Sequence, residues 1–352
     1  MPKEPVTRND VAAYAGVSTA VVSYVVNEGP RKVAPETRDR VLTAIRVLGY
    51  RPNATARALR MGTTRTLGLI TPDGGNPLFA ELAKAIDKEA AARGYVVLQT
   101  SADGDPETER AKIAELLVRQ VSGLVLVAPT ADPDLSAAEV PAIAINRVLP
   151  KVSSIRPAYR EGARQGVRHL IEHGHRRIAL VIGDASPNRA VVAERDVAAG
   201  EVLPVRGVQA GHRAARAERE LGWGDALRAA GLAPGLVVRV PFSRAGGRTA
   251  GDLLLAATKR PTAVFASSDL QAIGVLRAVR EAGLRVPEDL AVVAFDGTPE
   301  TEYSWPPLTV VRQPLELLAR EAVDRLIAGE QTVEALTLPT DLVVRRSCGC
   351  PN

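Results

Sequence analysis

Metal binding is the first chemistry that the residue types and spacings of this chain suggest. His169 and His173 lie four positions apart in HLIEHGH, and Cys348 and Cys350 lie two positions apart in RRSCGCP. Zinc prefers such ligands, but no Glu completes an H-E-x-x-H motif, and neither pair has further ligands near it in the sequence. We therefore expect no metal site, with reduced thiols in a C-terminal tail and histidines at an exposed helix end.

Enzymatic chemistry is not indicated either. The sequence has no Gly-rich phosphate loop and no Ser, His and Asp in the order of a catalytic triad. Its four histidines are His169, His173, His175 and His212. We predict a protein that is not an enzyme and that requires no cofactor.

Nucleic-acid binding is indicated by the distribution of charge. Residues 1–66 carry 11 Lys and Arg against 5 Asp and Glu, a net charge of +6, whereas the remainder carries 34 against 35, a net charge of −1. A basic segment on a nearly neutral body indicates an anion-binding module, for which nucleic acid is the commonest partner.

The segment STAVVSYVVN, residues 18–27, has the spacing of the second helix of a helix-turn-helix. It contains no charged side chain, whereas such helices usually direct Arg, Lys or Gln toward base edges. Base recognition would then depend on DNA shape, thymine methyl groups and one Tyr hydroxyl. On helix geometry its valines pack inward, and four residues face the groove: Thr19, Ala20, Ser23 and Tyr24.

Short helices are expected to position these groups over the first 60 residues. Thr7 opens a capping box, and Gly16 ends that helix. Ser18 caps the second helix, the third spans 35–49, and Asn53 caps a fourth, shorter one before a linker.

Strands alternate with amphipathic helices from residue 67 onward. Near-continuous apolar strands between helices predict doubly wound parallel sheets that are covered on both faces. There are too many strands for one sheet, so we expect two similar α/β subdomains with a cleft at their facing strand ends. The predicted strands are 66–72, 95–101, 123–129, 141–146, 177–183, 236–241, 261–268 and 290–297, and helices are predicted at 78–94 and 106–120.

The overall composition is that of a globular protein, with 46% hydrophobic and 24% charged residues. No apolar run approaches the roughly 20 residues of a membrane-spanning helix. The first ten residues lack the apolar segment of a secretory signal. We expect a cytoplasmic protein without a membrane partner.

The sequence VTRNDVAAYAGVSTAVVSYVVN, followed by VAPETRDRVLTAIRVLGYRPNATARALR, closely resembles the lactose-repressor (LacI/GalR) family of bacterial transcription regulators. Further matches include HLIEHGHRRIALVIG, SSDLQAIGVLRAVREAGLRVPEDLAVVAFDG and LVVRRSCGCP, so the resemblance covers essentially the whole chain. It implies an all-α helix-turn-helix head with a hinge helix, plus an α/β periplasmic-binding-protein-like effector domain of two doubly wound parallel-sheet subdomains.

The resemblance assigns base contacts to Thr19, Ala20 and Tyr24. Tyr24 stands where some members carry Arg, and its alternative role is a surface ring packed on the third helix. Phosphate contacts are expected from helix N-termini and from polar side chains near them: Ser18, Ser23, Asn27 and Lys32.

The resemblance also implies a hinge helix in NATARALR that enters the minor groove beside its twin from a second subunit. Leu59 takes the position of the Leu that wedges into the central base step, and Ala56 that of the close-packed contact. Asn53 caps this helix, and Arg57 adds positive charge. So short a helix is marginal alone, and we expect it to form only on DNA and against its twin.

Family members bind a small molecule, often a sugar or nucleoside-like metabolite, between the subdomains. The matching positions offer carboxylate, amide, hydroxyl and guanidinium groups that suit a polyol, and one ring that could stack on it. They are Asn76, Phe79, Asn146, Arg147, Arg219, Ser268, Asp269 and Asp296. Asp269 and Asp296 have an alternative structural role at helix or strand ends.

Departures from the family pattern make a remodelled or non-sugar pocket an alternative. Asn146 and Ser268 stand where many members have Asp and Asn. The stretch 183–223 is longer than usual, with the extra segment at about 186–217, where a pocket loop should lie. Arg195 in that segment competes with Arg219 for the guanidinium role.

The expected domains are a DNA-binding domain (1–50), a hinge and linker (51–66), an effector domain (67–347) and a tail (348–352). Within the effector domain, the N-subdomain is expected at about 67–156 plus 298–328. The C-subdomain is expected at about 157–297 plus 329–347.

The resemblance implies a sequence-specific DNA-binding transcriptional regulator, usually a repressor, whose operator affinity is controlled by its effector. The expected partners are a pseudo-palindromic double-stranded operator, the small molecule, and further copies of the chain in a homodimer or tetramer. Induction and corepression are both compatible with the sequence. A solute-binding protein of a transport system is the main rival, and the basic helical head argues against it.

Overall fold

The structure is a computed structural model in which the chain divides into two compact units, Met1–Arg65 and Thr66–Asn352. No helix in the described ranges is both long and apolar enough to span a membrane. The residues described are 6–26, 31–51, 63–130, 132–133, 135, 140–183, 191–193, 210–329 and 333–350.

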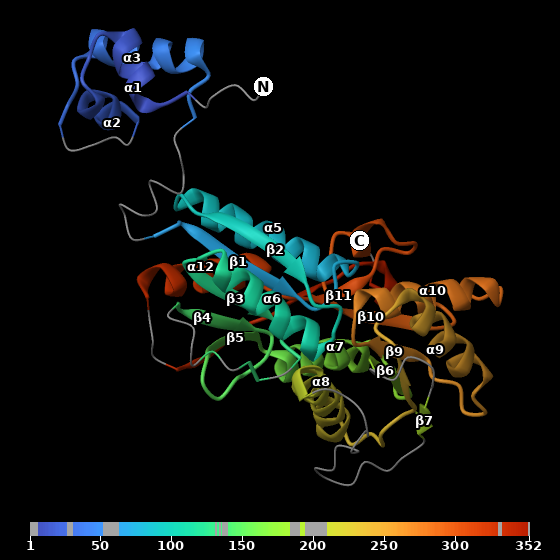
Figure 1. Ribbon diagram of the computed structural model, residues 1–352. Helices are drawn as coiled ribbons and strands as arrows, with labels where there is room; N and C mark the ends of the chain where they lie inside the picture. The colour runs from blue at the N-terminus through green and yellow to red at the C-terminus, as the bar shows by residue number, and fades with distance from the viewer. Residues whose placement is uncertain are drawn as a thin grey trace. The chain divides into compact units, whose positions relative to one another are not determined.

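The N-terminal unit contains helices and no strand over its described residues (Figure 1). Thr7 accepts a hydrogen bond from the backbone N–H of Asp10, whose carboxylate accepts one from the N–H of Thr7, so the predicted capping box forms. Gly16 and Gly49 end the first and third helices with φ angles of 63° and 65°, as predicted. The helices are α1 (Arg8–Ala15), α2 (Thr19–Val26) and α3 (Pro35–Leu48).

The core of this unit is small and aliphatic. Val22 and Val25 are buried on α2, as the helical spacing predicts, and Val26 packs partly buried against them. Every buried residue among those described in the unit is classed as hydrophobic: Val11, Ala12, Ala15, Val22, Val25, Val41, Ala44 and Tyr50. The polar side chains therefore remain at its surface.

The first sheet of the effector unit, which defines the N-subdomain, has the strand order β12-β5-β4-β3-β1-β2 and is parallel throughout. Two helices, α5 (Pro77–Ala92) and α12 (Leu315–Ala328), cover one face, and α6 (Pro106–Val118) covers the other. The strands are β1 (Thr66–Thr71), β2 (Val96–Ser101), β3 (Gly123–Val127), β4 (Ala142–Ile145), β5 (Ser153–Pro157) and β12 (Ala335–Leu338).

The second sheet, which defines the C-subdomain, has the order β13-β11-β10-β9-β6-β8-β7 and is parallel except at its two edge strands. Two helix pairs cover its faces: α7 (Tyr159–Glu172) with α8 (Ala210–Ala229), and α9 (Arg244–Ala256) with α10 (Asp269–Glu281). The strands are β6 (Ile178–Gly183), β7 (Val191–Ala193), β8 (Val237–Val240), β9 (Ala263–Ala266), β10 (Ala291–Asp296), β11 (Thr309–Arg312) and β13 (Asp341–Val343). Short helices follow at α11 (Glu300–Tyr303) and η1 (Arg346–Cys348).

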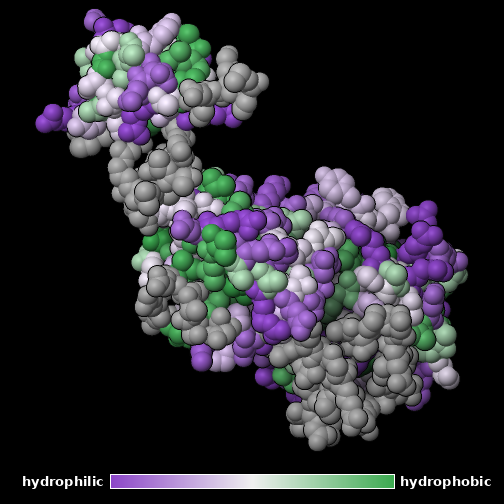
Figure 2. Space-filling model, in the orientation of Figure 1, coloured by the Kyte–Doolittle hydropathy of each residue, from purple (hydrophilic) through white to green (hydrophobic). Residues whose placement is uncertain are grey.

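The outer surface of the effector unit agrees with this layering. On the face shown in Figure 2, hydrophilic residues cover much of the outer helices, including α6 and α10. All eight predicted strands are present, and two separate sheets hold them.

The predicted subdomain boundaries need two corrections. Strand β11 pairs with β10, so 298–312 belongs with the C-subdomain and not with the N-subdomain. Strand β12 pairs with β5, which returns 335–338 to the N-subdomain. The sequence pattern predicts a short apolar strand but does not indicate which sheet it joins. Here the chain crosses to the first sheet between β11 and α12 and returns to the second sheet between β12 and β13.

The predicted tail also needs correction at its first residue. Cys348 ends η1 and is only 1% exposed. Ser347 donates a hydrogen bond to the carbonyl of Val292 and accepts one from the N–H of Thr309, at 2.6 and 2.8 Å. These bonds fix the segment against the sheet, so it is part of the C-subdomain.

Candidate functional site

A cavity of about 380 Å³ lies where strands of both sheets of the effector unit end. Parallel strands of α/β folds present their carboxyl ends to ligands in this way, and the volume suits a small molecule. The N-subdomain contributes residues that follow β1, β2, β3 and β4. The C-subdomain contributes residues that follow β8, β9 and β11 or end β6 and β10, together with residues of α7 and α8. The polar and aromatic lining includes Asp73, Asn76, Phe79, Asp103, Asn146, Tyr159, Arg219, Phe242, Ser268, Asp296 and Gln313.

Six of the eight predicted effector residues line this cavity: Asn76, Phe79, Asn146, Arg219, Ser268 and Asp296. Two of them also begin helices, since Asn76 caps α5 and Ser268 caps α10 through their side-chain oxygens. Helix N-termini from both subdomains are therefore adjacent to the cavity, as expected for a site at strand ends.

The ion pair of Arg219 and Asp296 is buried in the wall of the cavity. The Nη2 of Arg219 donates to Oδ1 of Asp296 at 3.0 Å, and each side chain is only 7% exposed. The guanidinium carbon lies 4.5 and 4.4 Å from the ring centroids of Tyr159 and Phe295. Gln313 donates to the same carboxylate oxygen at 2.7 Å. Rings and hydrogen bonds thus hold this Arg in one orientation.

Burial controls the ionisation of the acidic groups here. It raises the pKa of Asp296 to about 6, even though Arg219 and the bond from Gln313 act in the opposite direction. It also raises the pKa of the neighbouring Asp269, and the charge of Asp296 adds to that rise. Above pH 6 Asp296 is therefore mostly ionised, and its carboxylate pairs with the guanidinium of Arg219.

Two buried acceptor atoms of the lining have no hydrogen-bond partner among the described residues. They are Oδ1 of Asn146 and Oε1 of Gln313. A buried acceptor without a partner costs about 1–3 kcal/mol, so a ligand that donates to these atoms would recover that free energy.

Backbone strain is concentrated around the cavity. Asp103, Ala128, Asn146 and Asp296 line it and have positive φ angles of 49°, 43°, 69° and 116°. Non-glycine residues rarely adopt such angles, and where they do the position is often functional. The last three terminate β3, β4 and β10, where the strain turns the chain at the cavity wall.

Arg147 and Asp269, both predicted as effector ligands, are not part of the cavity lining. The guanidinium of Arg147 donates to the carbonyl of Pro129 and to Asp132, both at 2.9 Å. The carboxylate of Asp269 accepts from the N–H and hydroxyl of Thr298 at 2.7 and 2.8 Å. Arg147 thus binds the segment after β3, and Asp269 takes its alternative structural role at the start of α10.

Tyr159, Phe242 and Gln313, which no sequence motif indicated, are brought into the lining by the fold. Gln313 carried a usable signal, since it is a polar residue directly after the strand β11. Arg195, the predicted rival of Arg219, lies outside the described residues.

The N-terminal unit presents α2 with its predicted outward face. Ser18, Thr19 and Ala20 are exposed, and the side-chain oxygen of Ser18 accepts from the N–H of Val21 at 3.4 Å, which is the predicted cap. Ser23 and Tyr24 are half-exposed. The predictions for Asn27, Asn53, Ala56, Arg57 and Leu59 concern residues outside the described ranges.

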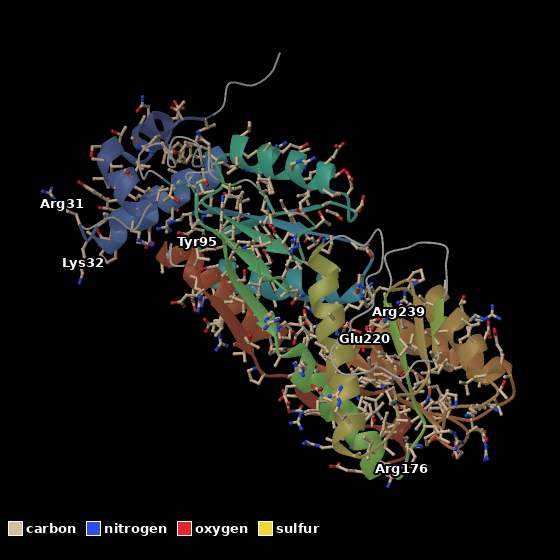
Figure 3. All side chains as sticks on the ribbon, turned by 90° about the horizontal axis from the view of Figure 1, so that it is seen from below. Arg31, Lys32, Tyr95, Arg176, Glu220 and Arg239 are labelled. Atoms are coloured by element: carbon tan, nitrogen blue, oxygen red, sulfur yellow. The ribbon has the colours of Figure 1, made fainter. Side chains whose placement is uncertain are left out.

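Positive charge accompanies this face in the loop before α3. Arg31 and Lys32 point away from the helices in Figure 3. Tyr24 lines a hollow with Lys32, Pro35 and Arg38, so it lies against the start of the third helix while remaining half-exposed. The two roles considered for Tyr24 are therefore compatible in one position.

A helix-turn-helix unit followed by a two-subdomain α/β unit with a cavity at its strand ends defines a ligand-responsive DNA-binding regulator. Residues 7–53 match the model of bacterial regulatory proteins of the lacI family, and residues 167–348 match the periplasmic binding protein-like domain. The chain belongs to the lacI family.

Similar proteins cover nearly the whole chain. The HTH-type transcriptional repressor PurR of Erwinia tasmaniensis is 33% identical over 97% of this chain and 96% of its own length, and PurR of Aliivibrio fischeri is 31% identical over 91% and 90%. The Lac repressor dimer bound to operator and the anti-inducer ONPF matches with a TM-score of 0.79 and 31% identity over 98% of this chain and 99% of its own. The CelR–cellobiose complex matches with a TM-score of 0.67 and 31% identity over 97% and 99%.

The protein is thus a lacI-family transcriptional repressor with an effector-binding domain, and not an enzyme. Its partners are operator DNA and a small-molecule effector. The rival interpretation as a solute-binding protein of a transport system is wrong.

Proposed function

We propose that a neutral polyhydroxyl molecule, a sugar or a related metabolite, binds in the cavity and controls the affinity for a pseudo-palindromic operator. The observation that carries the proposal is a pair of buried acceptors, Asn146 Oδ1 and Gln313 Oε1, that have no partner in the described part of the chain and lie beside the ion pair of Arg219 with Asp296. Hydroxyl donors satisfy such acceptors without adding a charge to be neutralised.

The remaining lining supports the same class of ligand. Phe79 offers an apolar ring on the N-subdomain side, and sugars stack their C–H faces on such rings. Arg219 and Asp296 offer directional donors and acceptors on the opposite side. CelR, a relative over almost the whole chain, is solved in complex with cellobiose.

A ligand in this position contacts both subdomains and can favour one angle between them. Gln313 lies directly between β11 and α12, where the chain crosses from one sheet to the other, so a ligand bonded to Gln313 is held at this crossing. Effector and operator are then coupled through a conformational equilibrium, whose sign depends on the state that the ligand prefers.

For DNA recognition we propose that Thr19, Ala20 and Tyr24 contact base edges and that Ser18, Ser23 and Lys32 contact phosphates. The exposed positions of Thr19 and Ala20 on α2 support this assignment. Leu59 remains the predicted wedge at the operator centre. Leu59→Ala should reduce both operator affinity and DNA bending, and undiminished bending would contradict the wedge.

We further propose that the protein acts as a homodimer, alone or as half of a tetramer, in the cytoplasm where its operator lies. Val96 and Leu98, on the edge strand β2, are 62% and 37% exposed and offer apolar area that a second copy could cover. Two-fold symmetry would match two half-sites. The Lac repressor relative is solved as a dimer on operator.

Calorimetry with the purified protein tests the effector class. Mono- and disaccharides are compared with nucleosides and free nucleobases, and Asp296→Asn is compared with Asp341→Asn, whose side chain is 74% exposed. We expect a saccharide to bind the wild type and the Asp341 variant equally, and the Asp296 variant at least tenfold more weakly. Binding of a nucleobase alone would instead support the remodelled, non-sugar pocket.

A further inference from the structure

The two histidines and two cysteines that the sequence separates meet in the C-subdomain. His169 Nε2 lies 3.2 Å from the Sγ of Cys348, across 179 positions of the chain. The Sγ of Cys350 lies 2.9 Å from His173 Nε2 and 3.6 Å from His169 Nε2. The ligand atoms of His169, His173 and Cys350 all lie within 4.8 Å of one another.

Each pair owes its position to the local fold. His169 lies in the last turn of α7, and His173 directly follows the helix, so their four-residue spacing places both rings on one side with centroids 4.3 Å apart. Gly349 between the cysteines has a φ of 97°, an angle that favours glycine. The chain therefore turns between the two cysteines and presents both sulfurs to the histidines.

Hydrogen bonds around the group prepare the side chains to bind an ion. His173 Nδ1 lies 2.8 Å from the carbonyl oxygen of His169, so this nitrogen carries the proton and donates it. The lone pair of Nε2 then faces Cys350. Histidines that bind metals commonly donate their second nitrogen to a carbonyl in this manner. The hydroxyl of Thr309 lies 3.1 Å from the sulfur of Cys348 and 3.0 Å from the carbonyl oxygen of Arg345, so it is within donor distance of the sulfur.

We propose that His169, His173, Cys348 and Cys350 bind one Zn²⁺ ion in a tetrahedral site of two nitrogens and two sulfurs. In such a site, metal bonds of about 2.0–2.3 Å place the ligand atoms roughly 3.3–3.8 Å apart, and small side-chain rotations reach this geometry from the distances observed. His173 is exposed and Cys350 is partly exposed, so an ion can enter from solvent.

The ion would join the C-terminal segment to the end of α7. The C-terminal segment and the end of α7, which meet here through weak sulfur hydrogen bonds, would be joined through four metal bonds. Because the unfolded chain holds the two pairs far apart, the ion would bind the folded state preferentially and stabilise it. The site is separate from the effector cavity, since none of its four residues lines that cavity.

A disulfide between Cys348 and Cys350 is the competing use of the same sulfurs, so the test keeps them reduced. Full-length protein is freed of metal with a chelator, then titrated with Co²⁺ and with Zn²⁺ in the presence of a non-thiol reductant. We expect one ion per chain, the charge-transfer and intense visible bands of tetrahedral thiolate-bound cobalt, and a thermal midpoint that rises with zinc concentration.

Two ligand variants and a matched control locate the ion. Cys350→Ser and His173→Gln should each weaken Zn²⁺ by more than the roughly 10–100-fold that loss of an outer hydrogen bond costs. His175→Gln should bind as the wild type does, because His175 contacts Thr262 instead. Circular dichroism of the metal-free variants verifies that they fold. Binding well below one ion per chain, cobalt spectra without thiolate bands, or equal affinity in all variants would overturn the proposal.

Discussion

The two units of this repressor place their polar groups in opposite ways. In the N-terminal unit every buried residue among those described is apolar, and the groups proposed to touch DNA are exposed or half-exposed. The effector unit buries Arg219 with Asp296, and a second pair, Arg239 with Glu220, whose side chains point toward one another in Figure 3. Exposed groups can adapt to a long DNA surface, whereas buried groups are held in fixed positions and can select one small ligand.

The two buried ion pairs differ in length and in their position relative to the cavity. The Arg239–Glu220 pair joins β8 to α8 at 2.6 Å, and neither residue lines the cavity. The Arg219–Asp296 pair is longer, at 3.0 Å, and both residues line it. The first is a structural pair, and the second is available to exchange partners with a ligand.

The largest effect is expected from Arg219→Met. This variant leaves Asp296 buried without its cation, which should cost about 3–5 kcal/mol of unfolding free energy. Effector binding should fall at least a hundredfold by calorimetry. The exposed pair of Arg248 with Glu281 supplies the control, since Arg248→Met should change stability by less than about 0.5 kcal/mol.

The small core of the N-terminal unit should be the next most sensitive region. Val22→Ala removes two buried methyl groups and should cost about 2 kcal/mol. Operator binding should weaken strongly, while effector affinity is unchanged. Val47→Ala on α3, at a side chain that is 60% exposed, is the matched control and should leave both affinities as they are.

Through Asp296, acidification should change ligand affinity and protein stability in opposite directions. As pH falls through about 6 the carboxylate is protonated, and the affinity for a ligand that donates to it should fall up to tenfold per pH unit. The free energy of unfolding should instead rise as the pH falls, because between pH 3.8 and about 6 the folded state binds more protons than the unfolded chain. Asp296→Asn should reduce the pH dependence of affinity measured by calorimetry, and an unchanged profile would exclude Asp296 as the titrating group.

The hydroxyl of Tyr24 should affect operator selectivity more than affinity. Tyr24→Phe should alter discrimination at one base position of each half-site by about 1 kcal/mol, roughly fivefold. Binding to a library of randomised operators measures this. Tyr14→Phe is the control, because Tyr14 lies on α1 with a 57% exposed side chain. If Tyr24→Phe and Tyr14→Phe show equal selectivity, the hydroxyl of Tyr24 does not read a base and Tyr24 has only its packing role.

The smallest effect is expected from Lys32→Ala. A phosphate contact carries no base information, so affinity should fall by a similar small factor for all sequences. The slope of log affinity against log salt should decrease in magnitude by about 1 per subunit. Lys259→Ala, an exposed lysine of the effector unit, should not change the slope.

Local signals in the sequence predicted local structure well. Thr7 and Gly16 mark the ends of α1 because capping and left-handed turns depend on a few adjacent residues. Asn76, Asn146 and Asp296 reach the cavity because carboxyl ends of parallel strands meet at one edge of a sheet. Such local signals could not predict where Arg147 binds, because its partners Pro129 and Asp132 lie 18 and 15 positions away in the sequence.

Long-range pairing was the part that the sequence could not supply. Strands β11 and β12 are each four residues long, and the sheet that each joins depends on where the chain crosses. The contact of Cys350 with His173 spans 177 positions, so no spacing rule could reveal it. In both cases the partner is chosen by packing of the completed fold.

Control of DNA binding by an effector requires that ligand in the cavity and operator on the helix-turn-helix are energetically coupled. The most direct test measures the coupling in both directions: operator affinity with and without saturating effector, and effector affinity with and without saturating operator. We expect the same factor in both, at least fivefold, because linkage between two binding equilibria is reciprocal. If a ligand is shown to occupy the cavity and operator affinity is unaltered, the proposed coupling between effector and operator is wrong.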